Sequence, residues 1–183
     1  MIIGISGKMC AGKDTLASYL LEYSGGSRIG FADKLKDICA ELFDIDPRSK
    51  DDYVRRILQK FGTEVGRNID QDVWVKYALR RAKTLQEPVI IPDVRFPNEL
   101  YGIQAVGGIV IRVVCDEEVR IERVKCLYGE QGLERFTHPS ETALDDAVFD
   151  YYVGTTSQAD MCSTAEPILD LIYLRSPNRW HGQ

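Results

Sequence analysis

The chain has 183 residues, which is enough for one domain with a sizeable buried core. Its 44% hydrophobic and 28% charged residues are typical of a globular protein, and its net charge of −5 gives no overall attraction to nucleic acid or to an anionic membrane. Five cysteines without a C-x-x-C pair indicate neither a zinc site nor a disulfide framework. Because no signal peptide and no membrane-spanning run is recognisable, we expect a cytoplasmic protein without a membrane partner.

Strands and helices alternate along the chain. A β-branched run predicts a strand over residues 2–6, and apolar residues at helical spacing predict a helix over 13–23 that ends at Gly25. Further strands are expected over 28–32, 89–91, 109–114 and 149–153, and further helices over 34–43, 52–61, 72–85, 98–105, 117–127 and 166–174. Residues 128–138 are polar, and 176–183 are expected to form a loosely held tail. The alternation of apolar strands with helices predicts an α/β fold with a parallel sheet covered on both faces.

The stretch GKMCAGKDT carries a phosphate-binding signature. Gly7, Gly12 and Lys13 match the pattern G-x-x-x-x-G-K-[ST], but Asp14 stands where the hydroxyl is expected and Thr15 follows one position later. The stretch follows a strand and opens a helix, and in this context backbone N–H groups and the helix N-terminus bind phosphate. We therefore predict a nucleoside triphosphate site with Lys13 on the outer phosphates, against the alternative of an ordinary glycine turn with an exposed lysine.

The apolar run VIIPD ends at Asp93 and predicts a second part of this site. In phosphate-loop enzymes an aspartate at the end of a buried strand helps to position Mg²⁺, and ligands of open α/β sheets collect at that edge. A simple cap at the end of the strand is the alternative interpretation.

Several arginines lie near these two motifs. Arg95 comes two residues after Asp93, Arg67 lies in the segment FGTEVGR, and Arg120 and Arg123 share one face of an expected helix. Each alone is typical of a solvated surface charge. Together they favour a kinase whose acceptor carries a phosphate, because such an enzyme needs arginines for the acceptor as well as for the donor.

The chain resembles the bacteriophage-type deoxynucleoside monophosphate kinases, which are phosphate-loop (P-loop) enzymes. The resemblance rests on six blocks in order, namely GKMCAGKDT at 7–15, FADKLKD at 31–37, RRILQKFGTEVGRNIDQDVWVKYA at 55–78, IPDVRFPNE at 91–99, GGIVIRVV at 107–114 and HPSETALDD at 138–146. It implies a three-layer α/β/α fold with a five-stranded parallel sheet and a small lid. It also implies transfer of the ATP γ-phosphoryl group to a deoxynucleoside 5′-monophosphate, with Mg²⁺, in a bacterium or a phage-infected bacterium.

The resemblance further implies one kinase domain over residues 1–183, with an acceptor-binding helical insertion at about 34–86 and a lid at about 117–141. It assigns the binding of ATP and its phosphates to Gly7, Lys8, Ala11, Gly12, Lys13, Asp14, Thr15 and Arg120. The metal is assigned to Asp14, Thr15 and Asp93, and catalysis to Lys13, Asp93, Arg95 and Arg123. The acceptor is assigned to Asp33, Lys36, Gln59, Arg67, Trp74 and Arg95.

Some points stay open at this stage. The block His138–Glu141 is either a structural loop or a substrate contact. Asp14 either joins Asp93 in the metal shell, which is favoured, or turns toward the acceptor side to pair with Arg95 or Lys36. Two other functions are retained: a related kinase that phosphorylates a hydroxymethylated base in DNA, and a nucleotide-binding module without turnover. A free nucleotide is favoured over nucleic acid as the acceptor, and formation of a homodimer is left open.

Overall fold

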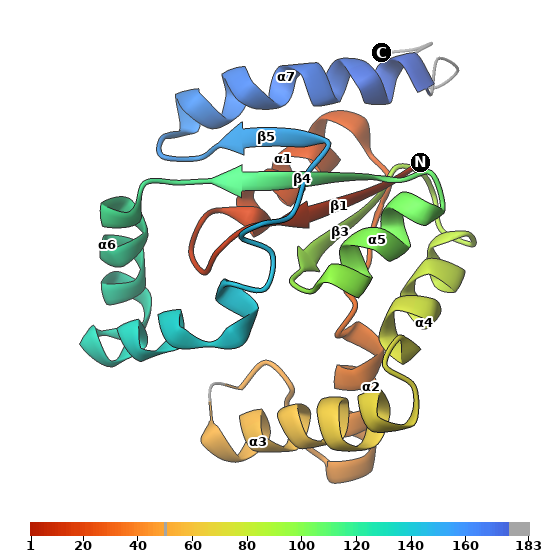
Figure 1. Ribbon diagram of the computed structural model, residues 1–183, viewed down its shortest axis with the longest axis vertical. Helices are drawn as coiled ribbons and strands as arrows, with labels where there is room; N and C mark the ends of the chain where they lie inside the picture. The colour runs from red at the N-terminus through yellow and green to blue at the C-terminus, as the bar shows by residue number, and fades with distance from the viewer. Residues whose placement is uncertain (50, 176–183) are drawn as a thin grey trace.

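The computed structural model describes residues 1–49 and 51–175. In this part of the chain five strands form one sheet, in which all neighbouring strands run parallel in the order β2-β3-β1-β4-β5. The strands are β1 (Ile2–Ser6), β2 (Ser27–Arg28), β3 (Val89–Val94), β4 (Ile109–Val114) and β5 (Tyr151–Gly154). The first strand therefore lies in the middle of the sheet (Figure 1), and the expected five-stranded parallel sheet is confirmed.

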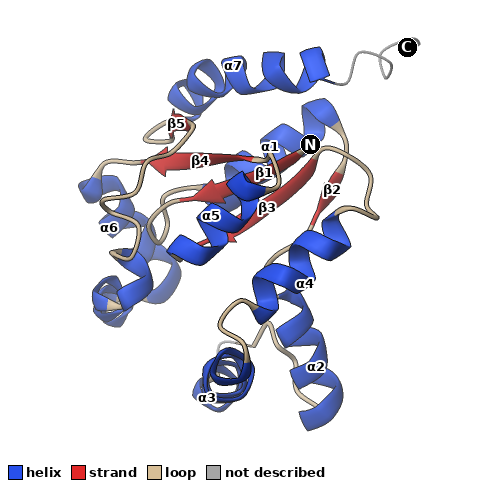
Figure 2. Ribbon diagram, turned by 45° about the vertical axis from the view of Figure 1, so that its right-hand side comes forward, coloured by secondary structure: helices blue, strands red, loops and turns tan. Residues whose placement is uncertain are grey.

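Helices cover both faces of the sheet, which gives the expected three layers (Figures 1 and 2). Helices α1 (Lys13–Ser24) and α7 (Gln158–Arg175) pack on one face, and α4 (Val73–Ala82) and α5 (Pro97–Ala105) pack on the other. The side chains of successive β3 residues point to opposite faces of the sheet: Ile90 packs on the α1 side and Ile91 on the α5 side. Both are fully buried, and each such side chain contributes roughly 1.5–3 kcal/mol to folding.

A helical arm lies between β2 and β3 in the chain and extends away from the sheet (Figure 1). It consists of α2 (Asp33–Phe43), α3 (Asp52–Lys60) and a π-helical segment, η1 (Phe61–Arg67), before α4 returns to the sheet. The Asp51 carboxylate caps α3 by accepting from the Tyr53 N–H at 2.7 Å.

Helix α3 continues as a π-helix because of close packing against Trp74. The indole Nε1–H of Trp74 donates to the Gly62 carbonyl at 3.0 Å, and a Cβ at Gly66 would come within 2.6 Å of the Trp74 ring. Glycine is therefore required at position 66, and the wider turn delivers Arg67 to the edge of the sheet.

A second projecting region follows β4. It contains α6 (Glu117–Tyr128) and two 3₁₀ segments, η2 (Glu130–Thr137) and η3 (Pro139–Glu141), before the chain returns to β5. In Figure 1, α6 extends from the carboxyl end of β4, and η2 and η3 lead back toward the middle of the molecule.

Several elements differ in their bounds from the expectation, and the main differences concern β2, residues 128–138 and α7. Strand β2 has two residues instead of the expected run over 28–32, because the backbone turns at Phe31, where Asp93 accepts its N–H. The polar stretch 128–138 contains a 3₁₀ helix. Helix α7 begins at Gln158 and not at residue 166, and it includes Pro167. Among the described residues, no helix is long and apolar enough to cross a membrane. The expected tail at 176–183 lies outside the described residues.

Candidate active site

The loop between β1 and α1 has the backbone of a phosphate-binding turn. Gly12 has φ 97°, and Cys10, a non-glycine residue, has φ 58° in the left-handed region. The Lys13 ammonium lies across this loop and donates to the carbonyls of Gly7 at 2.8 Å and Lys8 at 3.0 Å. Burial, together with the nearby charge of Arg95, lowers the pKa of Lys13 to about 8. Lys13 is therefore a largely buried cation that is held by carbonyl groups of its own loop.

Asp93 lies at the carboxyl end of β3, where its position was predicted, and it holds the neighbouring turn. Its two oxygens accept the N–H groups of Phe31 at 2.9 Å and Ala32 at 3.2 Å. Asp33 accepts the Gly30 N–H at 2.6 Å and lies 4.0 Å from the Lys36 ammonium. Burial raises the pKa of Asp93 above its usual range. These contacts match the alternative in which Asp93 caps a turn, and its metal role stays a prediction.

Asp14 and Thr15 are both exposed at the start of α1. The Asp14 carboxylate forms an ion pair with Arg28 of β2, so its partner is neither Arg95 nor Lys36, the two that were considered for the acceptor side. No group of three or more metal-binding side chains gathers within residues 1–49 and 51–175. Mg²⁺ bound with a nucleotide needs only one or two carboxylates besides phosphates and water, so Asp93 and Asp14 would be enough, and their metal role stays a prediction.

The predicted lid arginines contact the backbone of the phosphate loop. Arg120 Nε donates to the Met9 carbonyl at 3.0 Å, and Arg123 Nη1 donates to the Cys10 carbonyl at 3.3 Å. Arg123 also donates to the carbonyl of Thr155 at 2.8 Å, while the Thr155 hydroxyl donates to the Ala11 carbonyl. Helix α6 and the turn after β5 therefore fix the backbone of the phosphate loop through hydrogen bonds to its carbonyls.

A buried carboxylate joins the two arginines that were predicted to hold the acceptor. Glu99, in the first turn of α5, is 3% exposed and accepts the backbone N–H groups of Arg95 at 2.7 Å and Phe96 at 3.0 Å. It also accepts from Arg67 Nη2 at 3.1 Å, and the Arg67 guanidinium lies 4.5 Å from the centre of the Phe96 ring. Arg67 is thus fixed by a charge and by an aromatic face.

The other predicted acceptor residues are more dispersed. Trp74 is buried and holds η1 through its bond to Gly62, so its observed contact is within the arm. Gln59 lies on α3 and lines a hollow of about 400 Å³ together with Arg55.

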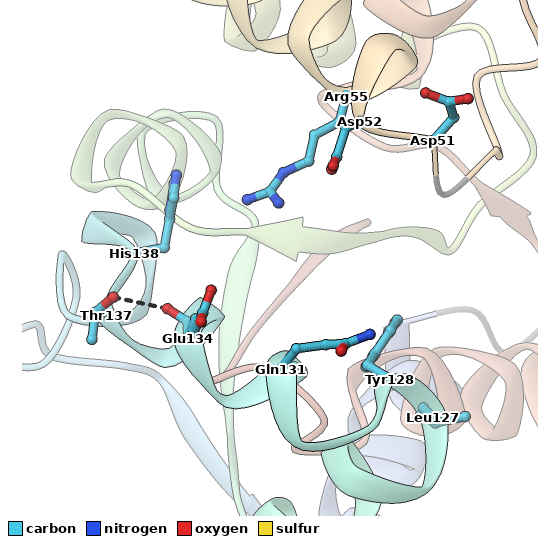
Figure 3. Close-up of a pocket in the computed structure, with 10 residues that line it drawn as sticks. Asp51, Asp52, Arg55, Leu127, Tyr128, Gln131, Glu134, Thr137 and His138 are labelled. Atoms are coloured by element: carbon cyan, nitrogen blue, oxygen red, sulfur yellow. Dashed lines mark hydrogen bonds between the residues drawn. The ribbon is translucent and has the colours of Figure 1, made fainter.

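A larger cleft of about 960 Å³ separates the arm from the region after β4 (Figure 3). Arg55 and Asp52 point into it from α3, and Gln131 and Tyr128 lie on the opposite wall, with His138 at one side. None of the residues that line this cleft had been assigned to the site, although His138 belongs to the block that was left open as a structural loop or a substrate contact. The other lining residues, except Arg55, lie outside the recognised sequence blocks, so nothing in the sequence singles them out.

Comparison with known proteins identifies the family. A model of the family "Deoxynucleotide monophosphate kinase" matches residues 48–144, which is just over half of the chain. The chain belongs to this family. A protein of Acanthamoeba polyphaga mimivirus with the name "Putative deoxynucleotide monophosphate kinase" is 30% identical over 141 residues, which cover 62% of this chain and 73% of the viral protein.

Solved structures agree on the fold. TT1252 from Thermus thermophilus superposes with a TM-score of 0.62 at 18% identity, covering 93% of this chain and 96% of that protein. Shikimate kinase from Bacteroides thetaiotaomicron superposes with a TM-score of 0.57 at 15% identity, covering 94% and 98%. The chain is therefore a deoxynucleotide monophosphate kinase family member with a P-loop kinase fold.

Sequence reasoning missed Glu99 and assigned no role to Glu141, whose block was left open, although both lie in blocks that carry the family resemblance. Glu99 ends the block IPDVRFPNE, and Glu141 lies in HPSETALDD. A signal was available for Glu99, because a glutamate in the first turn of a helix that follows Pro97 is typical of a capping contact. For Glu141 only the block itself was a signal.

The titration of Glu99 gives a stability prediction. Burial raises its pKa from 4.5 to about 7 despite its three N–H donors, so the folded protein holds a proton that the unfolded chain releases at lower pH. Stability from this group is therefore lost as pH rises from about 5 to about 7. Glu99→Gln cannot ionise, so it should gain stability relative to wild type over that range, by on the order of 3 kcal/mol.

Urea unfolding of both proteins at pH 5 and pH 8 measures this difference. Glu122→Gln, an exposed glutamate on α6, serves as the control and should show no such change. A Glu99→Gln offset that is the same at both pH values would mean that Glu99 is ionised throughout.

Proposed function

We propose that the protein transfers the γ-phosphoryl group of ATP to a deoxynucleoside 5′-monophosphate, which yields ADP and the deoxynucleoside diphosphate. The observation that carries this proposal is the closeness of two anion-binding groups. Arg95 is near enough to Lys13 for its charge to lower the lysine pKa, and the backbone N–H of Arg95 and the guanidinium of Arg67 both donate to Glu99. A donor phosphate on the loop and an acceptor phosphate on the arginines would thus meet at one edge of the sheet.

The donor would bind along the phosphate loop. Lys13 would leave the carbonyls of Gly7 and Lys8 for phosphate oxygens, which are stronger acceptors because they are charged. Arg123 donates to the Cys10 carbonyl of the loop, so it would add positive charge beside the transferred group. Phosphoryl transfer depends mainly on such positioning and charge neutralisation.

Mg²⁺ would be held by Asp93, with Asp14 and the hydroxyl of Thr15 nearby, and it supplies charge neutralisation on the phosphates when bound. The Asp14–Arg28 ion pair is exposed, so exchange of Arg28 for a metal or its water costs little.

The acceptor would lie between the arm and the region after β4, with its phosphate on Arg67 and Arg95. The cleft in Figure 3 supports this arrangement, because closure of the arm (about 34–86) against the lid (about 117–141) would exclude water from the transferring group. Asp51 and Asp52 on the α3 side and Glu134 on the opposite side add negative charge to the cleft, which favours a free mononucleotide over a DNA strand with many phosphates.

A coupled assay of ADP release tests the proposal, with ATP and Mg²⁺ against all common deoxynucleoside and ribonucleoside monophosphates and a hydroxymethylated DNA oligomer. We expect turnover with one or more deoxynucleoside monophosphates. Turnover with the oligomer alone, or ATP binding without any turnover, would contradict the proposal and favour the DNA kinase or the module without catalysis.

Lys13→Ala should lower kcat at least about a hundredfold, because a charge-assisted contact is lost where negative charge builds up. The steady-state rate with saturating ATP measures the effect. Lys83→Ala, at an exposed position after α4, is the control that should keep wild-type turnover. A folded Lys13→Ala protein within a few-fold of wild type would remove Lys13 from the mechanism.

Arg67→Met and Arg95→Met should lower kcat/KM for the acceptor by about tenfold to a hundredfold and leave ATP affinity nearly unchanged. Kinetics with varied acceptor, combined with calorimetry of ATP binding, separate the two effects. Arg81→Met, which loses an exposed bond to Thr84, is the matched control. An equal loss of ATP affinity would assign both arginines to the donor instead.

A further inference from the structure

The segment from His138 to Asp145, here called the strap, returns from η2 across the phosphate loop. Glu141 Oε2 accepts the backbone N–H of Met9 at 2.6 Å. Four residues later, Asp145 accepts from the Lys8 ammonium at 3.2 Å and from Arg112 of β4 at 3.1 Å. The strap therefore contacts the first half of the loop with two carboxylates.

The contact of Glu141 with Met9 is next to Cys10, whose backbone conformation is unfavourable. Cys10 has φ 58°, a conformation that is unfavourable for a non-glycine residue and persists only where its surroundings fix it. The preceding residue is held on both sides, since Glu141 accepts the Met9 N–H and Arg120 donates to the Met9 carbonyl. Arg123 holds the Cys10 carbonyl.

Glu141 also balances the charge of Arg120. The Glu141 side chain is 12% exposed, and its carboxylate lies 3.8 Å from Arg120 Nη2, whose side chain is 8% exposed. Arg120 further lies 4.7 Å from the centre of the Phe136 ring, which leaves it a narrow choice of positions. A buried guanidinium is costly without a nearby anion, so removing Glu141 would release Arg120 as well as Met9.

We propose that Glu141 is a positioning residue of the donor site, which holds Met9 and Arg120 so that the loop has its phosphate-binding shape before ATP arrives. The inference rests on one part of the proposed function, namely that this loop binds the phosphates of ATP. The strap also reaches the cleft, because His138 lines it and bonds through Nδ1 with the Ser140 hydroxyl at 2.8 Å. One short segment thus contacts both the donor loop and the space proposed for the acceptor.

Two measurements on Glu141→Ala test this role, and neither needs an acceptor. Calorimetry should show ATP and ADP binding weakened by about tenfold, as expected for the loss of a hydrogen bond to a charged group. N-ethylmaleimide labelling of the nucleotide-free protein, followed by mass spectrometry, should show Cys10 reacting several-fold faster. The four other cysteines should keep their rates and thereby report that the fold is intact.

Glu141→Gln and Asp146→Asn complete the experiment. The glutamine keeps an oxygen for the Met9 N–H but loses the charge beside Arg120, so its effects should be intermediate. Asp146 is an exposed carboxylate next to the strap, and Asp146→Asn should match wild type in both measurements.

Two results would overturn the proposal. Unchanged ATP affinity and unchanged Cys10 labelling in both Glu141 variants would mean that the loop keeps its shape alone. Tighter ATP binding in either variant would mean that Glu141 competes with the phosphates. If the kinase assay found no acceptor, weaker nucleotide binding and faster Cys10 labelling would still support the positioning role.

Discussion

The backbone of Met9 and Cys10 is held by side chains that come from far along the chain, and the candidate active site depends on this contact. Arg120 and Arg123 of α6 bind the carbonyls, and Glu141 binds the Met9 N–H. A glycine-rich loop alone is free to adopt many shapes, because glycine loses the most conformational entropy on folding. Fixing the loop through α6 and the strap means that its shape depends on the region predicted to be a lid.

Buried carboxylates play the same part on the acceptor side. Glu99 fixes Arg67 and the backbone at Arg95 much as Glu141 fixes Arg120 and the backbone at Met9. Burying an ion costs several kcal/mol, and the N–H donors offset this cost only in part, as the raised pKa of Glu99 indicates. The result in each case is an arginine held in one place, so little entropy remains to be lost when a phosphate binds.

The sheet and most helices could be predicted from the sequence, because buried parallel strands are continuous apolar runs and their helices have a clear apolar face. The errors have local causes. Helix α7 was expected to start at 166, yet the Ser157 hydroxyl accepts the Asp160 N–H at 3.1 Å and the helix begins earlier. Strand β2 was expected to be longer, and its end is set by Asp93 from another strand, which no local pattern reveals.

The candidate site could be predicted only in part, for a related reason. The loop and Asp93 have spacing that indicates their position, whereas the partners of Asp14, Arg67 and Arg120 depend on long-range contacts. The recognised sequence blocks include Lys13, Arg67, Trp74 and Arg95. A block of sequence does not reveal which side chains are in contact in the fold. Arg120 and Arg123 were expected as a mobile pair over the phosphates, and their observed partners are backbone carbonyls of the loop.

The charge of the whole chain and the charge of the site have opposite signs. The net charge is −5, yet Lys13, Arg95, Arg120 and Arg123 gather about one loop, and the lysine pKa falls to about 8 as a result of burial and of Arg95. Glu141 partly offsets this, because its charge acts on Lys13 in the opposite direction. A triphosphate brings several more negative charges to the same place, so its binding would raise the lysine pKa and favour the charged form. The surrounding acidic surface would act against long polyanions, while a small nucleotide that reaches the loop meets mainly positive charge.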